Sequence, residues 1–132
     1  MEKLAIDGGT SVRREKIFYG HQWIEEDDIE AVCDTLRSDY LTCGPKIEEM
    51  EYTLKMYTGA EYAVAVSNGT AALHCACIAA GIGAGDEVIT TPITFAASAN
   101  CVLYCGARPV FADINPKTYN IDPNSIRAHI TK

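Results

Sequence analysis

Short strand-like runs alternate with apolar helical segments between residues 62 and 112, and this alternation is what most constrains the fold. The runs are rich in β-branched and aromatic residues, and a glycine follows each helical segment. The predicted elements are three strands, Tyr62–Val66, Glu87–Thr91 and Pro109–Ala112, and two helices, Thr70–Ala80 and Thr94–Tyr104. Strands that alternate with helices of this length pair in parallel through right-handed crossovers. The sequence therefore predicts an α/β fold with a parallel sheet.

Helical patterns also flank this region. The segments Ile24–Ser38, Pro45–Gly59 and Asn124–Ile130 are predicted to be helices, and the stretch 115–123 is rich in turn residues. Three parallel strands leave open sheet edges, which stable domains normally pair or cover. We therefore expect residues 1–132 to be a fragment with no domain boundary inside it.

The charge balance excludes several classes of partner. Eighteen acidic and eleven basic residues give a net charge of −7, which is a poor match for the phosphate backbone of nucleic acids. No basic segment followed by an apolar run opens the chain, and no stretch has the length of a membrane-spanning helix. We expect a cytoplasmic protein that binds neither nucleic acid nor membranes.

Six cysteines are present, and most of them lie inside apolar helical patterns. Without a secretion signal, reduced and buried thiols are expected rather than disulfides. Cys101 and Cys105 share a helix face, but no CxxC pair or nearby histidine completes a ligand set. No metal site is predicted.

The segment Ser67–Ala72 marks the point where a predicted strand turns into a helix. A helix start offers free amide hydrogens and the positive end of the helix dipole, so it attracts phosphate. Gly69 lets the backbone approach a ligand closely, and Thr70 adds a hydroxyl donor. An ordinary helix cap is the alternative, because Ser and Asn are preferred caps. The segment matches neither GxGxxG nor the GxxxxGK[ST] phosphate loop.

A second segment, Thr90–Asn100, follows the next predicted strand and contains Phe95. Ligands of parallel α/β sheets collect outside the carboxyl ends of the strands, so Phe95 and the Gly69 turn can line one crevice. An aromatic ring at that place can stack on a planar ligand. A place in the core is the alternative, and it is the more common one for a phenylalanine.

Several ordered motifs resemble the DegT/DnrJ/EryC1/StrS aminotransferases over nearly the whole chain. Residues 67–74 read Ser-Asn-Gly-Thr-Ala-Ala-Leu-His, residues 85–92 Gly-Asp-Glu-Val-Ile-Thr-Thr-Pro, and residues 94–100 Thr-Phe-Ala-Ala-Ser-Ala-Asn. Residues 38–45, 104–113 and 120–123 add further matching stretches. The Thr-Thr-Pro-Ile-Thr-Phe and Leu-Thr-x-Gly-Pro forms are most similar to the branch that aminates UDP-4-keto-6-deoxy-N-acetylhexosamines in pseudaminic acid synthesis.

This resemblance implies a fold-type-I enzyme dependent on pyridoxal 5'-phosphate. Residues 1–132 would be the amino-terminal part of its large domain, without the rest of that domain or the small domain. The whole enzyme would be a homodimer with active sites at the subunit interface. The implied cofactor residues are Gly69, Thr70 and Ala71 for the phosphate and Phe95 for the pyridine ring. The implied substrate residues are Tyr19, Asp39, Tyr40, Leu41 and Thr42. For the run 39–42, a plain turn between two helices is the alternative.

The implied reaction moves an amino group from glutamate to the cofactor and then to a UDP-sugar ketone. In the family a lysine holds the cofactor as a Schiff base, and both this lysine and the aspartate that pairs with the pyridine nitrogen lie beyond residue 132. No catalytic residue is therefore assigned, and the chain alone is expected to be inactive. Two alternatives remain: a sugar-nucleotide dehydratase of the same family, with histidine in place of the lysine, and a noncatalytic phosphate-binding or regulatory module.

The histidines and two aspartates are expected to have mostly structural roles. His74 is predicted to pack on its helix, and His129 to face solvent. His21 stays open as a neighbour of the substrate position at 19. Asp113 and Asp122 are predicted to be turn or cap residues.

Overall fold

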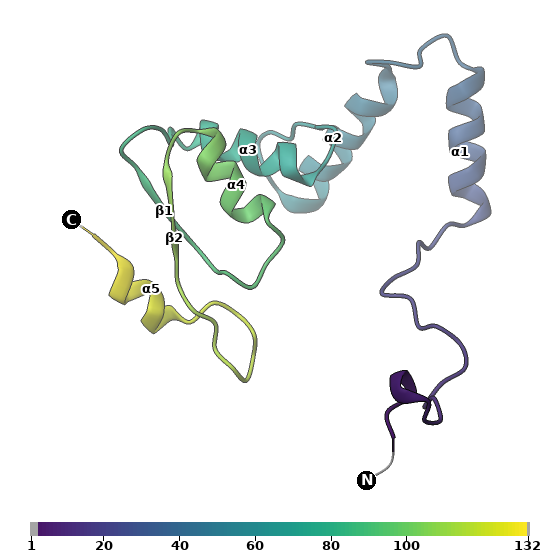
Figure 1. Cartoon of the computed structure of the whole chain (residues 1–132). Helices are drawn as coiled ribbons and strands as arrows, with labels where there is room; N and C mark the ends of the chain where they lie inside the picture. Colours follow the sequence, from purple (N-terminus) through teal and green to yellow (C-terminus); the bar gives the residue numbers. More distant parts are fainter. Residues whose placement is uncertain (1–2, 132) are drawn as a thin grey trace. The chain divides into compact units, whose positions relative to one another are not determined.

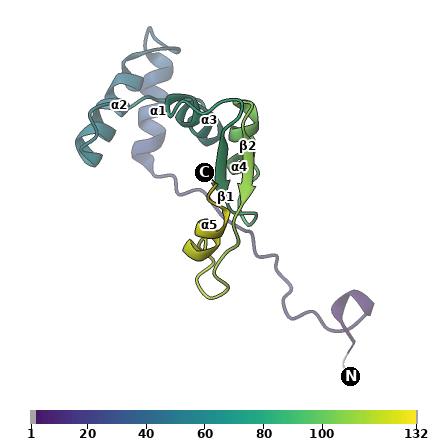
Figure 2. The same cartoon turned by 90° about the vertical axis from the view of Figure 1, so that its left-hand side faces the viewer.

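The computed structural model describes residues 3–131, which divide into two compact units, one ending at Glu49 and the other beginning at Met50. Figures 1 and 2 show the order of the elements along the chain. They are a 3-10 helix Ala5–Asp7, α1 Glu26–Arg37, α2 Pro45–Thr58, α3 Gly69–Ala79, β1 Glu87–Thr90, α4 Ala97–Tyr104, β2 Arg108–Phe111 and α5 Pro123–His129. All five predicted helices are confirmed, with α4 beginning three residues later than expected.

The second unit is built around two strands joined by a helix. β1 pairs with β2 in parallel, with Glu87 opposite Arg108 and Thr90 opposite Phe111. The helix α4 connects them and packs against both strands (Figure 1). This β-α-β arrangement confirms the predicted α/β fold with a parallel sheet.

Packing between α3, α4 and the strands forms the core. Val102 of α4 has no exposed surface, and Ala97, Cys101 and Ala107 are also buried. Half-buried apolar side chains of α3, β1 and the connection between them pack against this cluster: Cys77, Ile82 and Val88. The middle of α4 therefore forms the centre of the core of the second unit.

Both helices of this core end in the same way. Gly81 follows α3 with φ 77°, and Gly106 follows α4 with φ 75°, a left-handed conformation that suits glycine. The next amide folds back on the helix in each case: Ile82 N donates to Cys77 O at 3.0 Å, and Ala107 N donates to Val102 O at 3.2 Å. These two glycines end their helices as the sequence predicted, and they direct apolar residues into the core.

One predicted strand is wrong. Residues 62–66 are not part of any strand, and the only sheet in the described residues is the pair β1 and β2. Ala65 N donates to the side chain of Glu51 on α2 at 2.8 Å, instead of to a neighbouring strand. A strand requires a partner with which to exchange backbone hydrogen bonds, and local β-propensity does not supply one.

The cysteine environments also differ from the prediction. All six thiols are free, but only Cys101 is buried. The thiols of Cys43 and Cys75 are exposed, and the others are half-buried. An apolar helix pattern marks a face that packs on something, and in this structure the outer faces of α1 and α3 remain open.

Candidate functional site

The start of α3 is organised by Asn68. Its backbone is extended, with φ −170° and ψ 168°, and its side-chain Oδ1 accepts a hydrogen bond from Ala71 N at 2.9 Å. Its carbonyl oxygen accepts the amide of Ala72 at 3.1 Å, which begins the helical ladder. The side-chain nitrogen contacts Ser67 Oγ at 3.1 Å. Asn68 is therefore the helix cap that the sequence offered as the alternative to a phosphate site.

Two amides at this turn remain available to a ligand. Within residues 3–131, neither Gly69 N nor Thr70 N donates to any protein atom. The space above Gly69 is open, because no atom lies within 4 Å of the position that a Cβ would occupy. Thr70 is half-buried, and its hydroxyl makes no hydrogen bond to the described part of the chain. Free amides, a hydroxyl donor and open space at a helix start fit a phosphate group.

Phe95 lies in the connection between β1 and α4 and is 77% exposed. Its ring therefore does not point into the core, which was the alternative weighed from sequence. Its role in stacking on a ligand stays a prediction.

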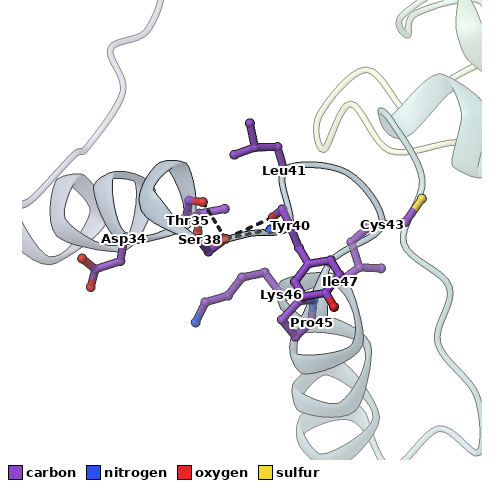
Figure 3. Close-up of a pocket in the computed structure, with 10 residues that line it drawn as sticks. Asp34, Thr35, Ser38, Tyr40, Leu41, Cys43, Pro45, Lys46 and Ile47 are labelled. Carbon is purple, nitrogen blue, oxygen red and sulfur yellow. Dashed lines mark hydrogen bonds between the residues drawn. The ribbon is translucent and has the colours of Figure 1, made fainter.

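A second concave site lies between α1 and α2, in the unit that ends at Glu49. A cavity of about 200 Å³ is bounded by the end of α1, the connection after it and the first residues of α2 (Figure 3). Tyr40 and Leu41, two of the predicted substrate residues, line it. Leucine, isoleucine and proline side chains around a tyrosine ring make a mostly apolar wall with few polar groups, which is common in small-molecule sites.

The conformation of Tyr40 is fixed by two neighbours. Ser38 Oγ donates to Thr35 O at 2.7 Å and lies 3.3 Å from Tyr40 N, from which it accepts. Figure 3 shows this serine between Thr35 and Tyr40, with its hydrogen bonds as dashed lines. A Cβ on Gly44 would meet Tyr40 Cβ at 2.9 Å, which is closer than carbon atoms approach without a shift. The turn therefore depends on Ser38 and Gly44, neither of which was singled out from the sequence as a site residue.

Two charged residues that sequence reasoning missed, Asp34 and Lys46, also line this cavity. The ion pair of Lys46 is the better defined. Its ammonium forms an ion pair with Glu49 at 2.7 Å. The hydrogen bond and charge of Glu49 raise the pKa of Lys46 above its ordinary value, with a smaller contribution from Asp34. The group is exposed and stays protonated at neutral pH. Nothing in the sequence around Lys46, which follows the proline that begins α2, indicates that it lies at a cavity.

The other predicted substrate residues are not gathered here. Asp39 and Thr42 do not line the cavity, and Tyr19 is fully exposed in a segment without helix or strand. The run 39–42 connects α1 to α2, as the turn alternative proposed. Contact between these residues and a substrate stays a prediction.

The histidines and aspartates behave mostly as expected. His74 packs its ring edge-on against Tyr104, with the ring centroids 5.3 Å apart. His129 is exposed. Asp122 caps α5 by accepting from Asn124 N at 2.9 Å, and Asp113 accepts from Ile114 N at 2.8 Å in the turn after β2.

Over residues 3–131, no group of three or more His, Cys, Asp or Glu side chains is placed to hold a metal ion. The same part of the chain contains no helix with the length and apolar content needed to cross a bilayer.

A parallel β-α-β unit next to a helix start with free amides defines an α/β protein that can hold a phosphorylated ligand. Comparison with known proteins identifies the family within this class. The chain belongs to the DegT/DnrJ/EryC1/StrS aminotransferase family, whose model matches residues 22–132.

Sequence similarity to individual proteins is consistent with membership of this family. The chain is 47% identical over 113 residues to the spore coat polysaccharide biosynthesis protein SpsC of Bacillus subtilis, covering 86% of this chain and 29% of SpsC. It is 43% identical over 107 residues to the UDP-2-acetamido-2-deoxy-3-oxo-D-glucuronate aminotransferase of Pseudomonas aeruginosa, covering 80% of this chain and 30% of that enzyme. The chain thus spans less than a third of the length of these relatives.

Solved structures of sugar aminotransferases have a similar fold over most of this chain. The PLP-form of Spr1654 from Streptococcus pneumoniae, described as a sugar aminotransferase, aligns with a TM-score of 0.81 at 37% identity, covering 89% of this chain and 30% of Spr1654. Helicobacter pylori PseC, an aminotransferase of pseudaminic acid biosynthesis, aligns with a TM-score of 0.81 at 32% identity, covering 89% of this chain and 32% of PseC. These alignments confirm the predicted fold class.

Proposed function

We propose that this chain supplies the cofactor-phosphate turn and part of the sugar site of a sugar-nucleotide aminotransferase that uses pyridoxal 5'-phosphate. The observation that carries the proposal is the pair of free amides at Gly69 and Thr70, beneath open space at the start of α3. Family membership and a relative solved in its PLP-form support it.

The chain's own residues would bind and orient the cofactor. The free amides of Gly69 and Thr70 would hold the phosphate in the turn that Ala71 completes, where the Ala71 amide itself donates to Asn68. The exposed ring of Phe95 would stack on the pyridine ring. When bound, the cofactor supplies an electron sink for amino-group transfer. The helix dipole and the Thr70 hydroxyl stabilise the phosphate charge at this end of α3.

The finer assignment concerns the substrate. We propose a UDP-4-keto-6-deoxy-N-acetylhexosamine as the amino acceptor and glutamate as the donor, in a cytoplasmic homodimer of which this chain forms the amino-terminal part of the large domain. The UDP-2-acetamido-2-deoxy-3-oxo-D-glucuronate aminotransferase among the relatives supports a UDP-sugar as acceptor, and the likeness to PseC supports the pseudaminic acid branch. Tyr40 and Leu41, at the cavity between α1 and α2, are the residues assigned to substrate contact, together with Tyr19, Asp39 and Thr42.

Titration of the isotope-labelled chain with pyridoxal 5'-phosphate tests the proposal. We expect saturable shifts of the amide resonances of Gly69 and Thr70, and much weaker effects with pyridoxal, which lacks the phosphate. Thr70→Val removes one charge-assisted hydrogen bond, so affinity should fall roughly tenfold or more. Thr70→Ser keeps the hydroxyl and serves as the matched control. If these amides do not respond to the cofactor, or respond equally to pyridoxal, the phosphate assignment fails.

A further inference from the structure

Three thiols meet between α3 and α4, outside the residues assigned to cofactor and substrate. Cys77 lies on α3 and Cys101 on α4, whereas Cys105 caps the end of α4, one turn after Cys101. The two helices pack side by side (Figure 1). Both Cys101 and Cys105 lie close enough to Cys77 to raise the pKa of its thiol. Cys77 also packs directly against the core cluster that contains Cys101.

We propose that Cys77 and Cys101 form an oxidation site at which a disulfide cross-links α3 to α4. Two thiols that pack in one contact between neighbouring helices are the arrangement from which a disulfide can form. Cys101 is the favoured partner because it belongs to the buried cluster against which Cys77 packs, whereas Cys105 does not. Cys75 is two residues from Cys77 on α3, so it faces a different direction and is exposed.

A disulfide oxidant such as oxidised glutathione accepts the two electrons that the protein thiols lose. One protein thiolate attacks a sulfur of the oxidant, breaks its S–S bond and releases one reduced glutathione. The second protein thiolate then attacks the mixed disulfide, forms the Cys77–Cys101 bond and releases the second reduced glutathione. The two protein thiols lose two protons and two electrons in total, and the oxidant gains them.

Partial burial governs access to the site. Cys101 is 4% exposed, and Cys77 is half-buried, so the reagent reaches Cys77 first. Burial raises the pKa of the Cys77 thiol, and the neighbouring Cys101 adds to this effect. Because the thiolate is the nucleophile, the pair should react more slowly than an exposed cysteine.

The cross-link would tie together the two helices that carry the assigned cofactor residues. The turn at Gly69 begins α3, and Phe95 precedes α4. The oxidation site depends only on the contact between α3 and α4, so it stands whether or not the chain binds pyridoxal phosphate.

Peptide mapping of the oxidised chain tests the cross-link directly. The reduced chain is treated with oxidised glutathione, its remaining thiols are blocked, and it is cut after glutamate. Cleavage after Glu61 and Glu87 separates residues 62–87, with Cys77, from residues 88–132, with Cys101. We expect these two peptides to be joined after oxidation and to separate after reduction, with fragmentation spectra that assign the bond to Cys77 and Cys101.

Four variants identify the partners. Cys77→Ala and Cys101→Ala should abolish the joined peptides, whereas Cys75→Ala and Cys105→Ala should leave them unchanged. Far-ultraviolet circular dichroism of each reduced variant verifies that the helices are retained, and the wild-type fragmentation spectra give the assignment independently of any variant. The proposal is overturned if the wild-type peptides remain separate, or if the bond involves Cys75 or Cys105.

Discussion

At the scale of single residues, the turn between α1 and α2 shows how one missing methyl group shapes a site. Gly44 accepts the close approach of Tyr40, whose Cβ would lie 2.9 Å from an added Cβ. The preceding residue, Cys43, already has a left-handed φ of 50°, so the backbone has little freedom to relax. Tyr40 therefore has its position only because residue 44 is glycine.

We expect Gly44→Ala to displace Tyr40 and to distort the cavity. The clash involves the Cβ and backbone of Tyr40 rather than the end of a flexible side chain, so the turn itself must shift. Amide chemical shifts of residues 38–47 should change throughout, and binding of a UDP-sugar should weaken. Gly20→Ala is the matched control, because a Cβ there meets no atom within 4 Å. Unchanged shifts around Tyr40 would contradict this account.

At the scale of helices and strands, α4 holds the second unit together. Val102 is completely buried, and the next residue, Leu103, is 55% exposed on the same helix. Alanine substitutions at these two neighbouring positions therefore distinguish the contribution of core packing from that of helix propensity, because both positions lie in the same helix.

Val102→Ala should destabilise the chain by about 2 kcal/mol, because it leaves a cavity in a small core. Leu103→Ala should change the free energy of unfolding by roughly 0.5 kcal/mol or less, as expected for a largely exposed position. Urea unfolding followed by circular dichroism measures both. Equal losses for the two variants would show that α4 is not packed as described.

The local patterns of the sequence predicted the helices and the parallel strands because those elements depend on signals within a few residues. Glycines with positive φ end α3 and α4 at the predicted places. The segment 62–66 failed as a strand because strand formation depends on a partner, and its Ala65 amide is instead held by Glu51. For the same reason the sequence indicated the phosphate turn but not the roles of Ser38, Gly44 and Lys46, which arise only when two helices meet at a connection.

At the scale of the whole molecule, the lysines decide whether the described chain can hold an aldehyde cofactor covalently. A lysine that forms such a bond readily is activated by desolvation or by a neighbouring cation, both of which lower its pKa. Lys46 has the opposite environment, because Glu49 raises its pKa. The ammonium groups of Lys16 and Lys55 lie over the rings of Phe18 and Tyr62, 5.4 Å and 5.8 Å from the ring centroids.

We therefore expect no specific lysine adduct when the chain is treated with pyridoxal 5'-phosphate and then reduced with borohydride. Modification should be spread over several lysines, should rise with reagent concentration without saturating, and should be similar for pyridoxal without its phosphate. Mass spectrometry of the digested chain locates and quantifies each adduct. One lysine labelled in full at a limiting amount of pyridoxal 5'-phosphate, but not by pyridoxal, would show that this chain carries a Schiff-base residue of its own and would overturn the prediction that it is inactive alone.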